Sequence, residues 1–263
     1  MICIFDCETI PDSVLLRQVY GYEGNDADVS EQAFKAQKEK TGSEFLPIMF
    51  HQVVAISAVM ADEFGIFQRV SSMEGESEEA LIRSFLNFID KHNPKLVSFN
   101  GRIFDLPMLM TRAMRYNLSC PAYFEVDNRD LGKNKWENYR SRYSDRFHVD
   151  LMDHMGEFGA VRALKLDHLC AMAGLPGKYD VSGDMVMDLY YEHKIDKIKE
   201  YCESDVLNTY WLYLKYELLK GHLHVKDYAR ALEMMNERIV KNKEYFLIFN
   251  EAINRELLNI NNL

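Results

Sequence analysis

Acidic side chains suited to phosphodiester chemistry occur in three short segments of the chain. They are Asp6 and Glu8 after the first apolar run, Asp105 after a later one, and Asp205, with Tyr201 nearby, on a predicted helix near the end. Four carboxylates that meet at one point can hold two divalent cations, and two cations about 3.5–4 Å apart can assist phosphodiester hydrolysis. The residue types therefore fit metal-assisted hydrolysis, provided that the fold brings them together.

Local geometry favours this convergence. Side chains alternate along a strand, so Asp6 and Glu8 should point the same way and Cys7 the other way. Tyr201 and Asp205 are four residues apart and should share a helix face. Without cations the cluster would repel itself and raise the pKa of at least one carboxyl. Mg²⁺ or Mn²⁺, which both prefer oxygen ligands, would remove that conflict.

The hydrophobic pattern predicts the elements that must position these residues. Apolar runs typical of strands lie at residues 2–5, 53–59, 66–70, 95–99 and 149–151. Helical spacing is found at about 31–40, 78–92, 106–116, 195–219 and 226–258. A hairpin that starts a sheet, followed by strands reached through helical crossovers, predicts a three-layer α/β fold.

The same pattern suggests how the chain is divided. We expect one domain at residues 1–220, interrupted by a polar insertion at about 12–50, and a C-terminal helical extension at 221–263. The extension fits either an added helical layer or a dimer contact.

Composition narrows the class of protein. The 263 residues carry a net charge of −10, which argues against non-specific duplex binding but leaves a nucleic-acid enzyme open, since metal ions can supply positive charge at the site. No secretory signal pattern opens the chain, and no apolar run reaches the ~20 residues of a membrane span. Five cysteines without C-x-x-C spacing fit a reduced, cytoplasmic protein.

Three motifs resemble those of a known enzyme family. Asp6-Cys7-Glu8-Thr9, Ser98-Phe99-Asn100-Gly101-Arg102-Ile103-Phe104-Asp105 and Tyr201-Cys202-Glu203-Ser204-Asp205 are similar to the exonuclease motifs of DnaQ-like (DEDD) 3′–5′ exonucleases, tyrosine subtype. The second motif and the run at 50–57 are closest to a stand-alone group that resembles the proofreading domain of family B DNA polymerases. The resemblance covers about residues 1–216.

The resemblance implies a ribonuclease H-like fold with a mixed five-stranded sheet, and release of nucleoside 5′-monophosphates from a 3′ end. We expect a single-stranded nucleic acid as the substrate, with DNA favoured. It implies that two divalent ions, Mg²⁺ or Mn²⁺, are held by Asp6, Glu8, Asp105 and Asp205, and that Tyr201 holds the attacking water. Positions that contact the terminal nucleotide in relatives are Thr9, Ile10, Asn100 and Phe104. The residues outside the region of resemblance are too few for a polymerase module, so we expect any polymerase partner to be a separate chain.

Two other functions stay open from the sequence. The same site could trim RNA, which depends on whether it admits a 2′-hydroxyl. The chain could also be a non-catalytic nucleic-acid-binding module, although such a module has no use for a self-repelling acidic cluster. Residues 128–148 add a locally basic, aromatic segment, which we interpret as a guide for the single strand.

Overall fold

A single mixed sheet forms the centre of the molecule. The computed structural model describes residues 1–177 and 183–262. The sheet has five strands in the order β3-β2-β1-β4-β5. Their bounds are β1 Ile2–Pro11, β2 His51–Ala61, β3 Phe67–Ser72, β4 Lys95–Ser98 and β5 His148–Asp150. This confirms the α/β class and the five strands expected from the apolar runs.

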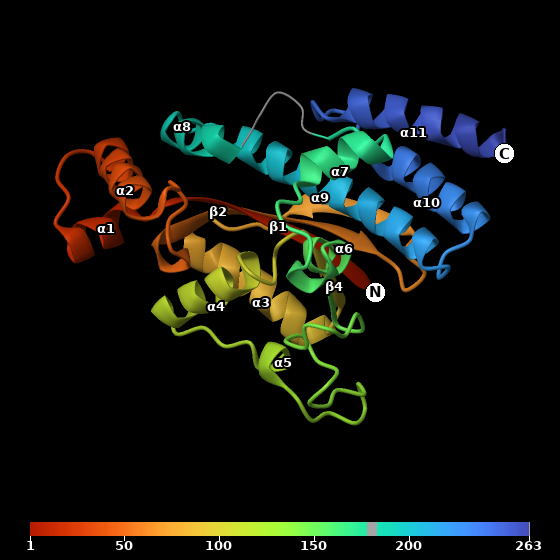
Figure 1. The fold of residues 1–263 in the computed structure, drawn as a ribbon, viewed down its shortest axis with the longest axis horizontal. Coiled ribbons are helices and arrows are strands. Elements are labelled where there is room, and N and C mark those ends of the chain that lie inside the picture. The colour runs from red at the N-terminus through yellow and green to blue at the C-terminus, as the bar shows by residue number, and fades with distance from the viewer. Residues whose placement is uncertain (178–182, 263) are drawn as a thin grey trace.

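Helices cover both faces of the sheet, so the molecule has three layers (Figure 1). One face carries α3 Glu78–His92, α4 Asp105–Arg115 and α5 Pro121–Phe124. The other carries the long helix α9 Ile195–Leu219, with α7 Leu166–Ala173, α8 Val186–Tyr191, α10 Val225–Arg238 and α11 Phe246–Asn261 around it. The short helix α6 Leu151–Met155 follows β5 directly.

The central strand β1 is longer than its parallel neighbour, and this difference creates an open edge. β1 pairs antiparallel with β2 along its whole length, from Ile2 opposite Ala61 to Pro11 opposite His51. It pairs parallel with β4 only from Ile2 to Ile4. Within the described part of the chain, β1 therefore has no strand partner on the β4 side beyond Ile4.

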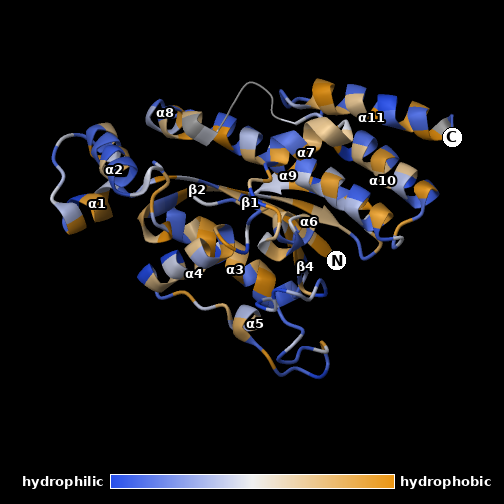
Figure 2. Cartoon of the chain, in the orientation of Figure 1, coloured by the Kyte–Doolittle hydropathy of each residue, from blue (hydrophilic) through white to orange (hydrophobic). Residues whose placement is uncertain are grey.

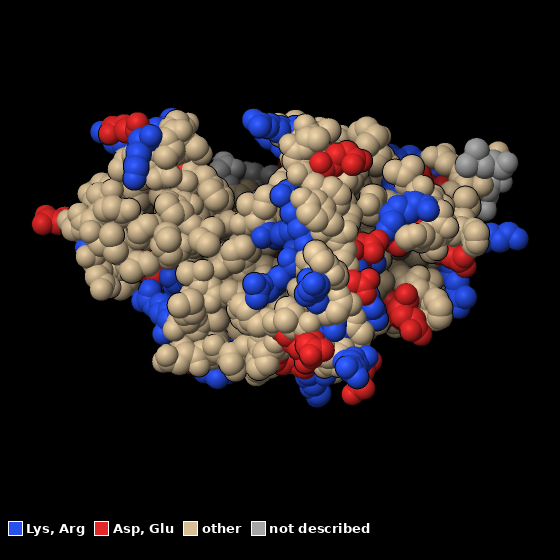
Figure 3. Space-filling view, turned by 60° about the horizontal axis from the view of Figure 1, so that its bottom comes forward, with Lys and Arg blue, Asp and Glu red and all other residues tan. Residues whose placement is uncertain are grey.

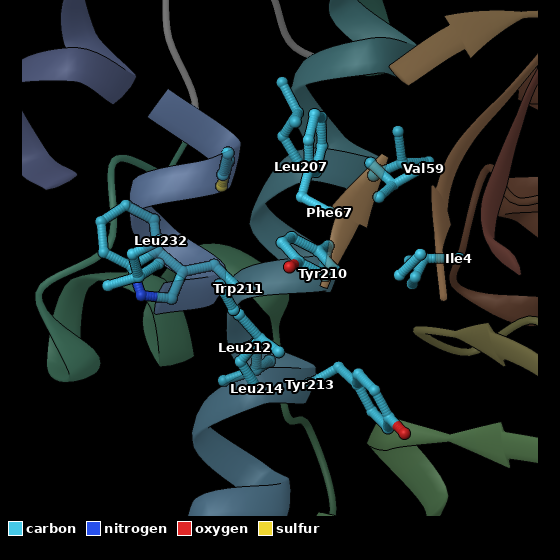
Figure 4. Close-up of a cluster of buried hydrophobic side chains, with 14 of the residues drawn as sticks. Ile4, Val59, Phe67, Leu207, Tyr210, Trp211, Leu212, Tyr213, Leu214 and Leu232 are labelled. Carbon is cyan, nitrogen blue, oxygen red and sulfur yellow. The ribbon is translucent and has the colours of Figure 1, made fainter. Parts of the chain in front are cut away.

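Helix α9 supplies the largest hydrophobic core. Figure 4 shows Tyr210, Trp211 and Leu207 of this helix packed between the strand residues Ile4, Val59 and Phe67 and Leu232 of α10. Polar atoms in this core are paired: the Tyr210 hydroxyl donates to Gly65 O at 2.8 Å, and Trp211 Nε1 donates to the Tyr228 hydroxyl at 2.8 Å. The bounds predicted for this helix, 195–219, are confirmed.

The insertion at 12–50 is a small helical unit with its own core. It contains α1 Ser13–Tyr20 and α2 Asp26–Thr41, and the residues of α2 are mostly hydrophilic (Figure 2). The helix expected at about 31–40 lies within α2, which starts earlier, at a capping box formed by Asn25 and Asp28. The expectation of a single helix was wrong, because α1 precedes α2. Its core consists of Leu16, Val29, Ala33, Leu46 and Phe50.

The region after α9 is also divided differently from the sequence expectation. The helical stretch predicted for 226–258 is two helices, α10 and α11, separated where Ile239 takes an extended backbone conformation. Both helices contribute side chains to the core that α9 forms with the sheet. The domain boundary at residue 220 stays a prediction. None of the described helices is long and apolar enough to cross a membrane.

Candidate active site

The two faces of β1 divide the candidate residues into two groups. Ile4 belongs to the core under α9, whereas Phe5 and Cys7 belong to the core under α3 and α4. Because side chains alternate along a strand, Asp6 and Glu8 lie on the α9 side. The site is therefore built around the open half of β1, with contributions from both helical layers.

Asp6 and Glu8 form the centre of the site together with a residue that sequence reasoning missed. Ligand atoms of Asp6, Glu8 and Cys202 all lie within 4.8 Å of one another. The Cys202 thiol donates a hydrogen bond to the backbone oxygen of Asp6 at 3.4 Å, and burial followed by the charges of Asp6 and Glu8 raises its thiol pKa. Cys202 is therefore a protonated thiol that packs the helix against the strand. Its place one residue after Tyr201 was the only sequence signal.

Asp105 reaches the site from the other helical layer. It is the first residue of α4 and is buried beside the open edge of β1. Its carboxylate accepts hydrogen bonds from the backbone N–H and the thiol of Cys7. Burial raises the pKa of Asp105 to about 7, against these bonds, and its Oδ1 atom is buried without a hydrogen-bond partner among the described residues.

The negative charges of Asp105 and Asp205 both act on the carboxyl group of Asp6. Neither belongs to the group whose ligand atoms lie within 4.8 Å of one another. Burial raises the pKa of Asp6 well above its ordinary value, and the charges of Asp105 and Asp205 raise it further. All four predicted carboxylates thus lie near one another in the fold: Glu8 lies beside Asp6, and the charges of Asp105 and Asp205 both act on Asp6.

Tyr201 and Asp205 lie on consecutive turns of α9, on the side that faces β1. Tyr201 is buried, and its hydroxyl is hydrogen-bonded to the Asp205 carboxylate. Burial raises the pKa of Tyr201, and the negative charges of Asp205, Glu8 and Asp6 raise it further. The phenol therefore keeps its proton at neutral pH and can act only as a hydrogen-bonding group.

The loop before Asp105 is held in shape by Asp150, the last residue of β5. The Asp150 carboxylate accepts hydrogen bonds from the backbone N–H groups of Asn100 at 2.9 Å and Arg102 at 2.8 Å. It also accepts one from the N–H of Met152 at 3.0 Å, which caps α6. Asn100 adopts a left-handed backbone conformation with φ 71°, which asparagine tolerates better than most residues. Asp150 is a positioning residue of the loop.

The four residues expected to contact a nucleotide have different surroundings. Thr9 lies on the α4 side of β1, where its hydroxyl is 2.9 Å from His51 Nδ1. Phe104 is half-buried and contacts the His51 ring edge-on, at 4.9 Å between centroids. Asn100 is half-buried in the loop. Ile10 is 3% exposed and packs in the core between β2, α8 and α9.

Residues 128–148 form an irregular segment in which only some of the cations are free for a ligand. Lys133 is buried, Arg142 makes a bidentate pair with Asp153, and Arg146 pairs with a neighbouring glutamate. Arg140 is exposed. Figure 3 shows Lys and Arg atoms in a column across the middle of the face turned forward, with Asp and Glu atoms to its right. The acidic chain thus has a basic strip on this face.

A solved structure has the same fold. A family B DNA polymerase from the hyperthermophilic archaeon Pyrobaculum calidifontis matches with a TM-score of 0.50 and 19% identity over 96% of this chain. The chain spans 26% of the length of that polymerase. The ribonuclease H-like fold expected from the motifs is confirmed. A search of curated proteins gives no match.

A family match covers most of the chain. The family described as "Predicted 3′-5′ exonuclease related to the exonuclease domain of PolB" matches residues 43–253. That range includes Asp105, Tyr201 and Asp205 and leaves out Asp6 and Glu8. In the structure, Asp6 and Glu8 lie on β1, and the charges of Asp105 and Asp205, which the match includes, act on Asp6. By this match and its fold, the chain belongs to the family of predicted 3′–5′ exonucleases related to the exonuclease domain of PolB.

Proposed function

We propose that the protein is a metal-dependent 3′–5′ exonuclease that acts on single-stranded nucleic acid, with DNA favoured, and releases nucleoside 5′-monophosphates. The observation that carries the proposal is the buried acidic cluster: ligand atoms of Asp6 and Glu8 lie within 4.8 Å of one another, and the charges of Asp105 and Asp205 act on Asp6. A fold gains nothing in stability from bringing three carboxylates together in a buried place. Such a cluster is typical of a site that binds cations.

The donor set fits two hard divalent cations. Its atoms are carboxylate oxygens, which Mg²⁺ and Mn²⁺ prefer, and the Oδ1 atom of Asp105 is buried with no partner among the described residues. We assign Asp6, Glu8, Asp105 and Asp205 as the ligands. When bound, the ions would polarise a water and stabilise the leaving 3′ oxygen.

Tyr201 would orient the water. Its hydroxyl proton is engaged with Asp205, so the lone pairs of the phenol oxygen remain free to accept a hydrogen bond from a water molecule. The raised pKa of Tyr201 makes the phenolate too rare for it to act as the base. Its contribution is therefore orientation of the water for in-line attack on the phosphorus.

The terminal nucleotide would lie at the edge of β1 beyond Ile4, where Asp105 meets the strand, with its base toward the α4 side. Thr9 and Phe104 lie next to metal ligands in the chain, and Asn100 begins the loop that ends at Asp105. We assign these three residues to nucleotide contact, with Ile10 as buried support of the strand. We also propose residues 1–220 as the catalytic unit.

Digestion of labelled oligomers tests the function directly. DNA and RNA strands labelled at the 5′ end, with Mg²⁺ or Mn²⁺ added, should give ladders that shorten by one nucleotide from the 3′ end. Asp6→Ala and Asp205→Ala should abolish the ladder while the circular dichroism spectrum stays unchanged. Full activity in both variants would refute the proposal.

The same digestion distinguishes the alternatives. Preference for RNA would move the assignment to the RNA-trimming alternative. An intact protein that neither degrades strands nor binds Mn²⁺ in calorimetry would favour the non-catalytic module.

A further inference from the structure

Three aromatic rings meet beside the acidic site, and one of them comes from the insertion. Phe45 lies 5.0 Å from the His51 ring and 5.1 Å from Phe104, between centroids. His51 and Phe104 are themselves in edge-to-face contact at 4.9 Å. Phe45 is 57% exposed. The three residues form a small cluster, which we call the aromatic shelf, with the Phe45 ring open to solvent.

Hydrogen bonds fix the middle ring of the shelf. His51 Nε2 lies 3.0 Å from Leu46 O, and His51 Nδ1 lies 2.9 Å from the Thr9 hydroxyl. A carbonyl oxygen can only accept, so Nε2 carries the proton and Nδ1 accepts from Thr9. The ring is thereby tied to β1 on one side and to the loop that carries Phe45 on the other.

Phe45 itself sits on an ordered backbone. Its N–H donates to Ser43 Oγ at 3.2 Å, and its carbonyl accepts from Gln37 Nε2 of α2 at 3.2 Å. The next residue, Leu46, is buried in the core of the insertion. A single exposed phenylalanine is common on protein surfaces and needs no explanation. Phe45 differs from such a residue because its backbone is hydrogen-bonded and its ring contacts two other rings while staying partly uncovered.

The place of the shelf beside the acidic cluster, and its small apolar area, favour an unpaired base as its ligand. Thr9 lies two residues after Cys7 on the same face of β1, and the Cys7 thiol and N–H donate to the Asp105 carboxylate, so the shelf borders the Asp105 side of the acidic cluster. A partner protein would need a far larger apolar area than one exposed ring. An unpaired base needs only an aromatic face, and stacking on such faces tolerates every base.

We propose that Phe45 stacks on an unpaired base of the strand whose 3′ end lies at the acidic cluster, and that this is a function of the insertion. The inference rests on the proposed exonuclease function and adds a residue outside the motifs to the substrate-binding surface. Stacking of this kind favours single strands, because a base held in a duplex cannot present its face to the ring.

The test compares Phe45→Ala with Phe45→Trp, which keeps an aromatic face. The matched control is Phe64→Ala, which removes another exposed phenylalanine (73% exposed) from the turn between β2 and β3. Phe45→Ala should raise KM for an oligonucleotide roughly 5- to 100-fold, as expected for loss of one stacked base. Phe45→Trp should restore KM, and Phe64→Ala should leave it unchanged.

Strands with one abasic nucleotide at successive positions from the 3′ end locate the contact. At the position that stacks on Phe45, the wild type and Phe45→Ala should have the same KM. A KM for Phe45→Ala equal to that of Phe64→Ala, or a penalty that persists at every abasic position, would overturn the inference.

Hydrolysis of the p-nitrophenyl ester of thymidine 5′-monophosphate separates the stacking proposal from the exonuclease proposal. If the wild type cleaves neither ester nor oligonucleotide, the exonuclease function fails, whereas cleavage with an unchanged KM in Phe45→Ala rejects only the stacking role.

Discussion

The hydroxyl of Tyr245 donates a hydrogen bond to Glu203 Oε2 at 2.9 Å. Glu203 lies between Tyr201 and Asp205 on α9, and its other carboxylate oxygen accepts from Ser72 of β3 at 2.9 Å. Lys243 adds an ammonium 3.5 Å from Glu203. Lys243 and Tyr245, which lie between α10 and α11, therefore hold the turn of α9 that carries the candidate catalytic residues. We call their contacts with Glu203 the clamp.

Removal of one clamp contact should affect catalysis as well as stability. We expect Tyr245→Phe to lose about 1.5–3 kcal/mol of unfolding free energy, the range for a hydrogen bond to a charged group. We also expect kcat to fall while KM for the oligonucleotide stays constant, because the turn that holds Tyr201 loses an anchor. Urea unfolding and steady-state kinetics measure the two effects.

The matched control for the clamp is Tyr228→Phe. The Tyr228 hydroxyl also contacts α9 and a carboxylate, through Trp211 Nε1 and Glu256 Oε1, but at a distance from the candidate site. This variant should lose stability and keep kcat. Equal kcat in both variants would show that the C-terminal segment is only structural.

Relief of carboxylate repulsion should make the protein more stable when cations bind. With Mn²⁺ at about 100 times its dissociation constant, the wild type should gain about 2.7 kcal/mol. Asp105→Asn should show a smaller gain, since it loses a ligand. In EDTA the same variant should be at least as stable as the wild type, because it removes a buried carboxyl whose pKa is raised to about 7.

Thermal unfolding with EDTA and with Mn²⁺ measures this difference. Asp62→Asn is a suitable control, since Asp62 accepts two backbone hydrogen bonds in the turn after β2, and an asparagine oxygen can accept the same bonds. An equal Mn²⁺-dependent gain in Asp105→Asn and in the wild type would contradict the assignment of Asp105 as a ligand.

The neutral state of His51 predicts a loss of stability in acid. Burial lowers the pKa of His51 below 6.5, and the charge of Arg112 lowers it further. Between the folded pKa and 6.5, the unfolded chain binds more protons than the folded one, so stability falls as pH drops below 6.5. His51→Gln should lose less unfolding free energy than the wild type between pH 7.5 and pH 5.5.

Urea titrations of both proteins at the two pH values isolate this contribution, because every other titrating group is present in both. The same loss of stability in wild type and variant would mean that burial does not hold His51 neutral in the folded protein.

The meeting of the acids could be predicted because it depends on short-range features. Asp6 and Glu8 alternate on a strand, Tyr201 and Asp205 share a helix face, and Asp105 starts a helix after a strand. Each feature follows from local spacing, and the chain order of strands and helices then fixes the sheet. The bounds of α9 were predictable for the same reason, since no glycine or proline interrupts the chain from Ile195 to Leu219.

Features that depend on contacts between distant segments could not be predicted. The break between α10 and α11 accompanies the contact of Tyr245 with Glu203, 42 residues away. The aromatic shelf joins Phe45 to Phe104, and no periodicity connects them. The burial of Ile10 follows from the extension of β1 to Pro11, which places Ile10 between β2 and α9 instead of at a free strand end.

The role of Tyr201 can be separated from that of the metal ligands by removal of one oxygen atom. Tyr201→Phe leaves all four carboxylates, so the stability gained from Mn²⁺ should be kept. Nucleotide release should fall roughly 100- to 10,000-fold, the range for loss of a group that assists proton transfer or orients the attacking water. Tyr210→Phe is the control, because it removes a buried hydroxyl from the same helix whose partner is Gly65 O. It should cost about 1 kcal/mol of stability and leave release unchanged. If the two variants release nucleotides at the same rate, the water is oriented by another group, because Tyr201 would then contribute no more than an ordinary buried hydroxyl.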